Sequence, residues 1–289
     1  MSRISPVAAA VLAALFHAAP AGSAAPSPPS LRPQQPPPQN PGEPREGQAG
    51  KDVIWLPTPG ALVERMLTMA QVGPRDVLYD LGSGDGRMVI AAAKRGAQAV
   101  GIEFNPELVA HSESQARAQG VARKARFVQG DFFETDFSQA SVVALYLLST
   151  LNMRLRPTLL KMRPGTRVVS HAFNMDDWAP DEVSRADQRT AYLWIVPAAV
   201  EGSWRVDLQR GPSFDVTLAQ RFQKIEGTLA LGTVAVGLRE PVLRGDTIRF
   251  GFVDQHGVWY ELSGTVSGDR MAGRFEADDG KGAWTASRR

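Results

Sequence analysis

The feature that most constrains the fold is a short apolar run that turns through glycines into an alanine-rich segment. Val77–Tyr79 predicts a buried strand that stops at Asp80, and Met88–Lys94 predicts a helix. Between them three glycines stand at alternate positions: Gly82, Gly84 and Gly86. Glycine allows a sharp turn and a close ligand approach, and the free N–H groups of a first helical turn attract anions. A strand, a glycine loop and a helix in this order predict a nucleotide-type binding site.

Two further predicted strands also end in acidic residues. Ala99–Glu103 predicts a buried strand, and Glu103 follows Asp80 at about the 20-residue offset of the ribose-binding acid in Rossmann-type units. A carboxylate there can accept hydrogen bonds from both ribose hydroxyls. Ala125–Asp131 predicts a third strand, after a helix over Pro106–Gln119. The alternatives are a Rossmann-like fold that binds another ligand, or a site that has decayed.

An acid at a strand end followed by alternating glycines resembles motif I of class I S-adenosylmethionine (SAM) methyltransferases. The resemblance implies a doubly wound, mainly parallel Rossmann-like α/β sheet with SAM as cofactor. An acid near the loop suits the ammonium of SAM, and backbone amides suit its carboxylate. In this superfamily the acid that ends the third strand, or its neighbour, typically contacts the adenine amino group. The cofactor-binding residues would be Asp80, Gly82, Ser83, Gly84, Gly86, Glu103 and Asp131.

Composition excludes several other classes of site. The net charge of +2 on 289 residues is too mild to indicate a nucleic-acid partner. The absence of cysteine excludes disulfides and thiolate zinc sites. The four histidines are scattered along the chain, so we expect no metal site.

The N-terminus has the pattern of a secretory signal peptide. Residues 1–25 contain a basic Arg3, the apolar core Val7–Ala19 and small residues near a cleavage site. Residues 26–51 are rich in proline and glutamine and predict a disordered spacer. We therefore expect a periplasmic or secreted protein. The alternative is an uncleaved membrane anchor, for which the spacer would be a stalk.

A helix over Gly60–Gln71 follows the spacer and begins with a capping pattern. Thr58 stands at the N-cap and Pro59 at the first helical position. Two interpretations stay open for the preceding segment. Trp55 and Leu56 could fasten this helix to the sheet, or the segment could cover the amino-acid end of the cofactor.

The acceptor side is expected at the end of the fourth strand. Ser141–Leu148 is almost uniformly apolar, as in a strand buried on both faces, and a helix is predicted over Met153–Met162. Ligands bind at the carboxyl ends of such strands. Tyr146, Ser149 and Asn152 are therefore candidate acceptor-side residues. The alternatives are a core aromatic for Tyr146 and a helix cap for Asn152.

Two later strands are predicted over Arg167–Phe173 and Tyr192–Val196, with too short a separation for the usual helices, so we expect a shortened sheet. His171 is a candidate base, or a structural histidine at a strand end. No catalytic residue is assigned, and the candidates are Tyr146, Asn152 and His171. Four aromatic side chains could line the mouth of the site: Phe132, Phe133, Tyr146 and Phe173.

Several of these blocks together resemble the family of the ATP synthase c-subunit lysine methyltransferase and its bacterial relatives, over about residues 52–197. The resemblance implies SAM as cofactor and, for the mitochondrial members, a lysine acceptor. The sequence departs from the family pattern at Ser149, where proline is usual, and at Ala172, where aspartate is usual. The blocks that carry the resemblance are Asp52–Pro59, the glycine loop, Leu145–Leu148, Leu151-Asn152, Leu155–Pro157, Pro164–His171 and Trp178.

The last third of the chain, residues 202–289, differs in kind. Polar and apolar residues alternate in short runs such as Trp204–Leu208 and Ile248–Phe252, separated by turn signals such as Arg244–Asp246. This pattern predicts an all-β domain, a small antiparallel barrel or sandwich, beside a methyltransferase domain over residues 52–197. The barrel could enclose a ligand cavity, or it could be solidly packed and dock on the first domain.

Two functions follow from the sequence. One is a SAM-dependent methyltransferase that acts on protein lysine or on a small molecule, which the acids at three strand ends favour. The other is a non-catalytic periplasmic binding module with a degenerate methyltransferase domain, which the signal peptide favours because SAM is made in the cytosol.

Overall fold

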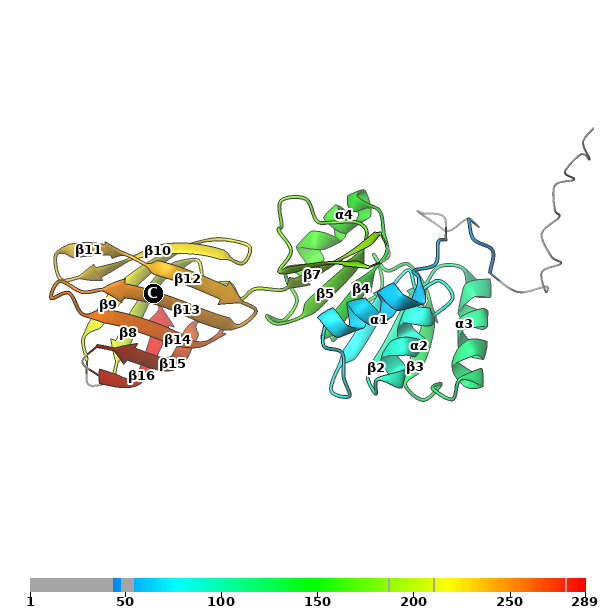
Figure 1. Cartoon of the computed structure of the whole chain (residues 1–289), viewed down its shortest axis with the longest axis horizontal. Coiled ribbons are helices and arrows are strands. Elements are labelled where there is room, and N and C mark those ends of the chain that lie inside the picture. Colours follow the sequence, from blue (N-terminus) through cyan, green and yellow to red (C-terminus); the bar gives the residue numbers. More distant parts are fainter. Residues whose placement is uncertain (1–43, 48–54, 187, 210, 279) are drawn as a thin grey trace, which may run out of the picture. The chain divides into compact units, whose positions relative to one another are not determined.

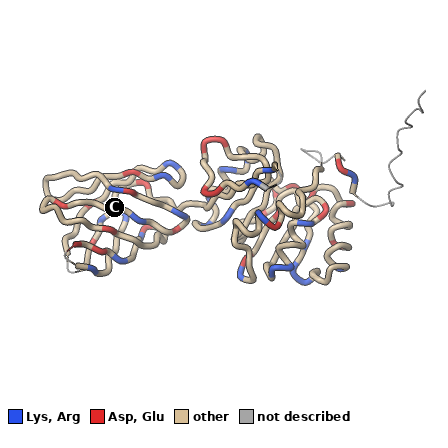
Figure 2. Tube along the Cα trace, viewed as in Figure 1, with Lys and Arg blue, Asp and Glu red and all other residues tan. Residues whose placement is uncertain are grey.

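The computed structural model describes residues 44–47 and 55–289, except residues 187, 210 and 279 (Figure 1). The expected signal peptide and the expected spacer, apart from residues 44–47, lie outside the described residues. Among the helices of the described part, none is both long and apolar enough to span a bilayer. Positive and negative side chains are interspersed along the chain (Figure 2), in keeping with the net charge of +2.

The first sheet has seven strands in the order β3-β2-β1-β4-β5-β7-β6. The first five strands along the chain pair in parallel, and β7 pairs antiparallel with both β5 and β6. The bounds are β1 Val77–Leu81, β2 Gln98–Glu103, β3 Ala125–Gln129, β4 Val142–Leu145, β5 Arg167–His171, β6 Glu182–Ala186 and β7 Arg189–Ile195. This arrangement confirms the predicted Rossmann-like, mainly parallel sheet.

Helices cover both faces of this sheet (Figure 1). One apolar cluster joins α1 (Gly60–Met69), α2 (Arg87–Lys94) and α3 (Pro106–Ala118) to one face. A second cluster joins α4 (Ser149–Leu159) to the opposite face. Since successive strand residues point to opposite faces, uniformly apolar strands such as β4 serve both clusters.

Four expectations for this part were wrong. The sheet is not shortened: the short segment after β5 carries the hairpin β6–β7 in place of helices. Strand β1 does not stop at Asp80 but continues to Leu81, and α4 begins at Ser149 rather than at Met153. Thr58 does not cap α1. Pro59 is the N-cap residue, without a side-chain cap, because the Thr58 hydroxyl is bonded elsewhere.

The second sheet consists of nine antiparallel strands in the order β11-β10-β9-β8-β16-β15-β14-β13-β12. Leu238, between β11 and β12, donates its N–H to the carbonyl of Gly227 on β10 at 2.9 Å, so the two edges of the sheet approach each other in a nearly closed barrel. The bounds are β8 Gly202–Leu208, β9 Ser213–Arg221, β10 Lys224–Leu231, β11 Val234–Gly237, β12 Arg239–Arg244, β13 Thr247–Val253, β14 Trp259–Ser267, β15 Arg270–Ala277 and β16 Gly280–Arg288. The predicted antiparallel barrel is confirmed.

Large aromatic side chains fill this barrel. Trp204, Phe214, Phe250, Phe252 and Trp284 are each at most 2% exposed and belong to one apolar cluster. Neighbouring rings meet edge to face, with centroids 5.1 Å apart for Phe214 and Phe252. This packing favours the solid barrel over a barrel with a ligand cavity.

Candidate active site

A cavity of about 380 Å³ opens at the carboxyl ends of the parallel strands. It lies between the glycine loop, the ends of β2 and β4, and the segment Trp55–Thr58 that precedes α1. Its volume falls in the range of small-molecule sites, and its position is the one at which open α/β sheets bind ligands.

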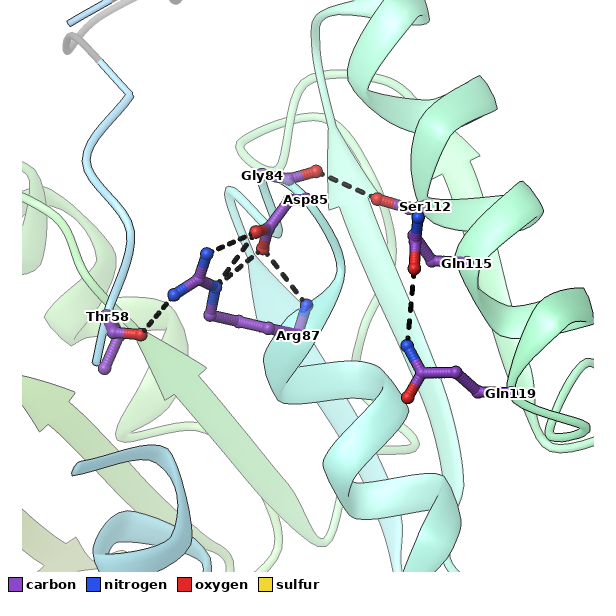
Figure 3. Close-up of polar contacts among 7 residues, drawn as sticks. All are labelled: Thr58, Gly84, Asp85, Arg87, Ser112, Gln115 and Gln119. Atoms are coloured by element: carbon purple, nitrogen blue, oxygen red, sulfur yellow. Dashed lines mark hydrogen bonds and ion pairs between the residues drawn. The ribbon is translucent and has the colours of Figure 1, made fainter. Parts of the chain in front are cut away.

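The glycine loop is packed closely on both sides. Gly84 has a positive φ of 54°, and a Cβ on it would lie 2.2 Å from Nε1 of Trp55. Gly86 has a φ of 80°, and a Cβ there would lie 2.7 Å from the ring of Phe127. The Ser112 hydroxyl of α3 donates to the Gly84 carbonyl at 3.0 Å (Figure 3). Both the backbone conformation and the space therefore require glycine at these two positions.

Glu103, at the end of β2, is hydrogen-bonded to the glycine loop. Its Oε2 accepts the N–H of Gly84 at 2.9 Å, and its Oε1 accepts the N–H of Asn105 at 2.9 Å. Asn105 itself caps α3 by accepting the N–H of Glu107. Each carboxylate oxygen has a second lone pair, so Glu103 can still accept hydrogen bonds from a ligand in the cavity.

Asp80 lies deep in the same cavity and is 7% exposed. Burial, and then the nearby charges of Glu103 and Asp85, raise the pKa of Asp80 from its ordinary 3.8 to about 8. The isolated protein therefore holds a proton on Asp80 at neutral pH. A cation bound beside the carboxyl group would favour its ionised form.

Arg87 ties the glycine loop to the segment before α1 (Figure 3). Its Nε donates to Oδ1 of Asp85 at 2.9 Å, and its Nη1 donates to the carbonyl of Thr58 at 2.9 Å. Among the described residues that line the cavity, Arg87 is the basic one, and the acidic ones are Asp80, Asp85, Glu103 and Asp131. The Trp55–Thr58 segment thus lies against the glycine loop.

His171 does not line the cavity but supports a residue that does. It is 1% exposed, its Nδ1 lies 3.1 Å from the Thr58 hydroxyl, and its ring stacks on Tyr146 with centroids 3.8 Å apart. Burial, and then the charge of Arg189, lower the pKa of His171 to about 4. A neutral, buried imidazole here orients Tyr146, which lines the cavity, and is a poor base.

Asn152 is fully buried behind the site, on α4. Its Nδ2 donates to the carbonyls of Phe173 and Asn174 at 3.2 and 3.3 Å. Neither Asn152 nor Ser149 lines the cavity, and the residue at the N-cap of α4 is Leu148. Asn152 is therefore neither a helix cap nor in contact with the cavity: it fixes the segment that carries Phe173.

Most predicted cofactor-binding residues lie together: Asp80, Gly82, Ser83, Gly84, Glu103 and Asp131 all line the cavity. Gly86 does not, because it lies against Phe127, and the side chain of Ser83 points toward Gly101 of β2. Of the four aromatic residues expected at the mouth, all except Phe133 line the cavity. No group of three or more histidine, aspartate or glutamate side chains in the described residues could hold a metal ion.

Two residues that line the cavity directly follow the motifs and were not predicted from the sequence. Arg87 follows the last glycine, and Phe104 follows Glu103. Three lining residues are exposed although they are apolar: Leu56 at 40%, Phe104 at 51% and Leu148 at 45%. Leu56 was considered from the sequence, whereas the adjacency of Phe104 to Glu103 is the signal that could have identified Phe104. Together the three form an apolar rim at the cavity.

The sheet order, the glycine loop and the acids at the strand ends define a class I SAM-dependent methyltransferase. The family model of the ANTKMT methyltransferase domain matches residues 80–182. A protein-lysine N-methyltransferase of Saccharolobus islandicus is 43% identical over 151 residues, which cover 50% of this chain and 94% of the archaeal protein. The chain therefore belongs to the family of this archaeal methyltransferase, which confirms the predicted enzyme class and its SAM cofactor.

Two further proteins are similar to this chain over about half of its length. The ATP synthase c-subunit lysine N-methyltransferase of Rattus norvegicus is 37% identical over 145 residues, which cover 50% of this chain and 67% of the rat protein. A solved structure described as an RNA methyltransferase from Salinibacter ruber with S-adenosyl-L-homocysteine is 50% identical. It covers 50% of this chain and 96% of its own, with a TM-score of 0.49.

Proposed function

We propose that this protein transfers the methyl group of SAM to the side-chain amine of a lysine in a protein. The observation that carries the proposal is the 43% identity to an archaeal protein-lysine N-methyltransferase that the chain covers almost completely. The rat relative is also named for a lysine in a protein. A small-molecule acceptor is the alternative.

The residues that would hold the cofactor fit its charges. In this proposal the buried carboxyl group of Asp80 pairs with the ammonium, and Glu103 accepts hydrogen bonds from the ribose hydroxyls. Asp131, which also lines the cavity, is the candidate partner of the adenine amino group. When bound, SAM supplies a methyl group on a sulfonium, which a neutral amine can attack.

The acceptor side must keep the lysine amine uncharged. Lysine has an ordinary pKa of about 10.4, and removal from water lowers it. Phe132, Tyr146 and Phe173 give this part of the cavity an apolar, aromatic lining. His171, with a pKa of about 4 and no place in the lining, is not the base in this proposal. The proton leaves to solvent before the amine enters.

The apolar rim favours a polypeptide acceptor over a small one. Leu56, Phe104 and Leu148 are each more than a third exposed around the cavity. Exposed apolar side chains grouped at one site are typical of surfaces that bind a partner. We propose that they contact apolar residues that flank the acceptor lysine.

The experiment is methylation of a peptide array with labelled SAM. The full chain is incubated with peptides that each contain one central lysine, in apolar or polar flanks, and with matched peptides in which arginine replaces that lysine. Mass spectrometry should find methyl groups on the lysine peptides, with a preference for apolar flanks, and none on the arginine peptides. The lysine proposal fails if the protein binds SAM but methylates no lysine peptide while it methylates a small-molecule amine.

A further inference from the structure

The turn between β9 and β10 contacts the segment that follows β5. Residues 41–289 form one compact unit, and within it Phe222, at the tip of this turn, packs against the apolar cluster on the α4 face of the first sheet. Its ring stacks on Trp178, with centroids 5.9 Å apart. Trp178 is fully buried and also packs on Trp194 at 6.1 Å. An aromatic residue of the barrel thus covers a tryptophan in the segment between β5 and β6.

Gln223, the next residue of the turn, uses both ends of its amide in the same contact. Its Oε1 accepts the indole N–H of Trp178 at 3.1 Å, and its Nε2 donates to the carbonyl of Ala179 at 2.6 Å. The contact therefore combines apolar packing with two hydrogen bonds that fix the orientation of the turn relative to Trp178 and Ala179.

Charged side chains also take part in the contact between the turn and the segment after β5. Asp177 accepts hydrogen bonds from Arg221 of the turn, at 2.9 Å, and from Arg156 of α4. The guanidinium of Arg156 also lies over the ring of Phe222, 5.4 Å from its centroid, and donates to the Met175 carbonyl at 3.1 Å. Arg156 therefore links α4, the segment after β5 and the turn at one point.

The segment held in this way begins in the active site. Phe173 lines the cavity, and its carbonyl accepts from Asn152 of α4 at 3.2 Å. Ala172 has a left-handed φ of 64°, a conformation that costs a non-glycine residue energy. Phe222 in the turn also has a left-handed φ, of 56°. Such conformations persist where the surroundings fix them, so the start of the segment and the turn are both held by their neighbours.

We propose that the turn Arg221–Lys224 is a positioning element of the acceptor side of the active site. By holding residues 175–179 in place, it fixes the path of the chain back to Phe173 and so shapes the wall that the acceptor amine meets. The barrel then acts on acceptor binding rather than on cofactor binding. The turn lies outside residues 80–182, which the family model matches. The proposal rests on the proposed methyltransferase function.

The test compares the wild type with the double variant Phe222→Ser/Gln223→Ala and with Phe222→Tyr, which keeps the ring. The first measurement is hydrogen–deuterium exchange of the amides of residues 172–181. The second is calorimetric affinity for S-adenosylhomocysteine. The third is KM and kcat for the best peptide of the lysine array. Val234→Ser is the matched control, because Val234 is an exposed valine (45%) that follows the opposite end of β10.

In the double variant we expect exchange of residues 172–181 to rise at least tenfold and KM for the peptide to rise at least fivefold. The affinity for S-adenosylhomocysteine should stay within twofold of wild type, and Phe222→Tyr and Val234→Ser should behave as wild type. Unchanged exchange, or faster exchange with unchanged KM and kcat, would overturn the proposal. If the double variant does not fold, Gln223→Ala alone is measured in the same way. If the wild type methylates a small-molecule amine but no lysine peptide, the proposed function fails, and the exchange measurement still decides whether the turn holds the segment.

Discussion

The raised pKa of Asp80 predicts that cofactor binding releases a proton. The side chain is buried beside Glu103 and Asp85, so the isolated protein keeps it protonated up to about pH 8. S-adenosylhomocysteine brings an α-ammonium, which is a cation at acidic and neutral pH. If the ammonium pairs with ionised Asp80, the bound state has a lowered pKa and the proton on Asp80 leaves during binding.

The magnitude follows from linkage. Where the free protein holds one proton more than the complex, the dissociation constant falls by up to about tenfold for each pH unit, or ~1.4 kcal/mol. Between pH 5.5 and 7.0 the affinity for S-adenosylhomocysteine should therefore rise by up to about thirtyfold. The affinity thus rises with pH, whereas the stability of the isolated protein should fall. Because the folded state binds more protons than the unfolded state between the ordinary pKa of 3.8 and the folded value of about 8, its stability falls as pH rises through that range.

The assay is calorimetry at each pH in two buffers with different ionisation enthalpies, which counts the released protons. Two controls separate Asp80 from the other acids of the site. Asp80→Asn cannot ionise, so its affinity should lose the pH dependence. 5′-Methylthioadenosine lacks the amino-acid end, so its binding to the wild type should also be independent of pH. Binding of S-adenosylhomocysteine that releases no proton and does not vary with pH would refute the pairing of Asp80 with the ammonium.

Three further predictions concern other residues of the chain. Glu103→Ala should weaken S-adenosylhomocysteine by about ten- to a hundredfold, because hydrogen bonds to a charged group contribute roughly 1.5–3 kcal/mol. It should also lower the melting temperature of the isolated protein, since the Gly84 N–H loses its acceptor; unchanged affinity would remove Glu103 from the site. Arg87→Ala should speed dissociation of the cofactor product about fivefold in stopped-flow measurements, since a hydrogen bond of ~1 kcal/mol to the Thr58 carbonyl is lost. An unchanged rate would mean that the segment before α1 does not retain the ligand. Mass spectrometry after native expression should find a mature N-terminus near Ala25, and a protein that retains Met1 would contradict the predicted signal peptide.

The first sheet could be predicted because its signals are local. The parallel strands are short, largely apolar runs followed by a turn signal or a helix, and three of them, β2, β3 and β5, end in a polar residue. The acids at the ends of β1 and β2 meet in one cavity because the carboxyl ends of parallel strands share one edge. The Thr58 hydroxyl was predicted wrongly for the opposite reason. Its partner, His171, is distant in sequence, and nothing near Thr58 indicates that a tertiary hydrogen bond replaces the local cap.

Several barrel strands were not predicted because glycine takes the place of core side chains. In β10 only Ile225 and Leu229 are buried, and Gly227 stands between them, so the period-two pattern is interrupted. Gly264 and Gly273 pair across β14 and β15, and a Cβ on Gly264 would lie 2.7 Å from the ring of Trp284. The large ring needs the space that the glycines leave. The alternation of apolar residues is therefore interrupted in the sequence at positions where a neighbouring ring fills the core.

The contact between the turn and Trp178 also bears on how the domain boundary can be tested. Separate cores for residues 52–197 and 202–289 stay a prediction, and deletion of residues 202–289 is its direct test. That deletion would also remove Phe222 from Trp178, whose carbonyl accepts the indole N–H of Trp194 at 2.7 Å in the sheet beneath. Loss of activity in the truncated chain would therefore not distinguish an unfolded first domain from a displaced acceptor wall. Substitutions in the turn leave both domains present in the chain, so they must be measured before any truncation is interpreted.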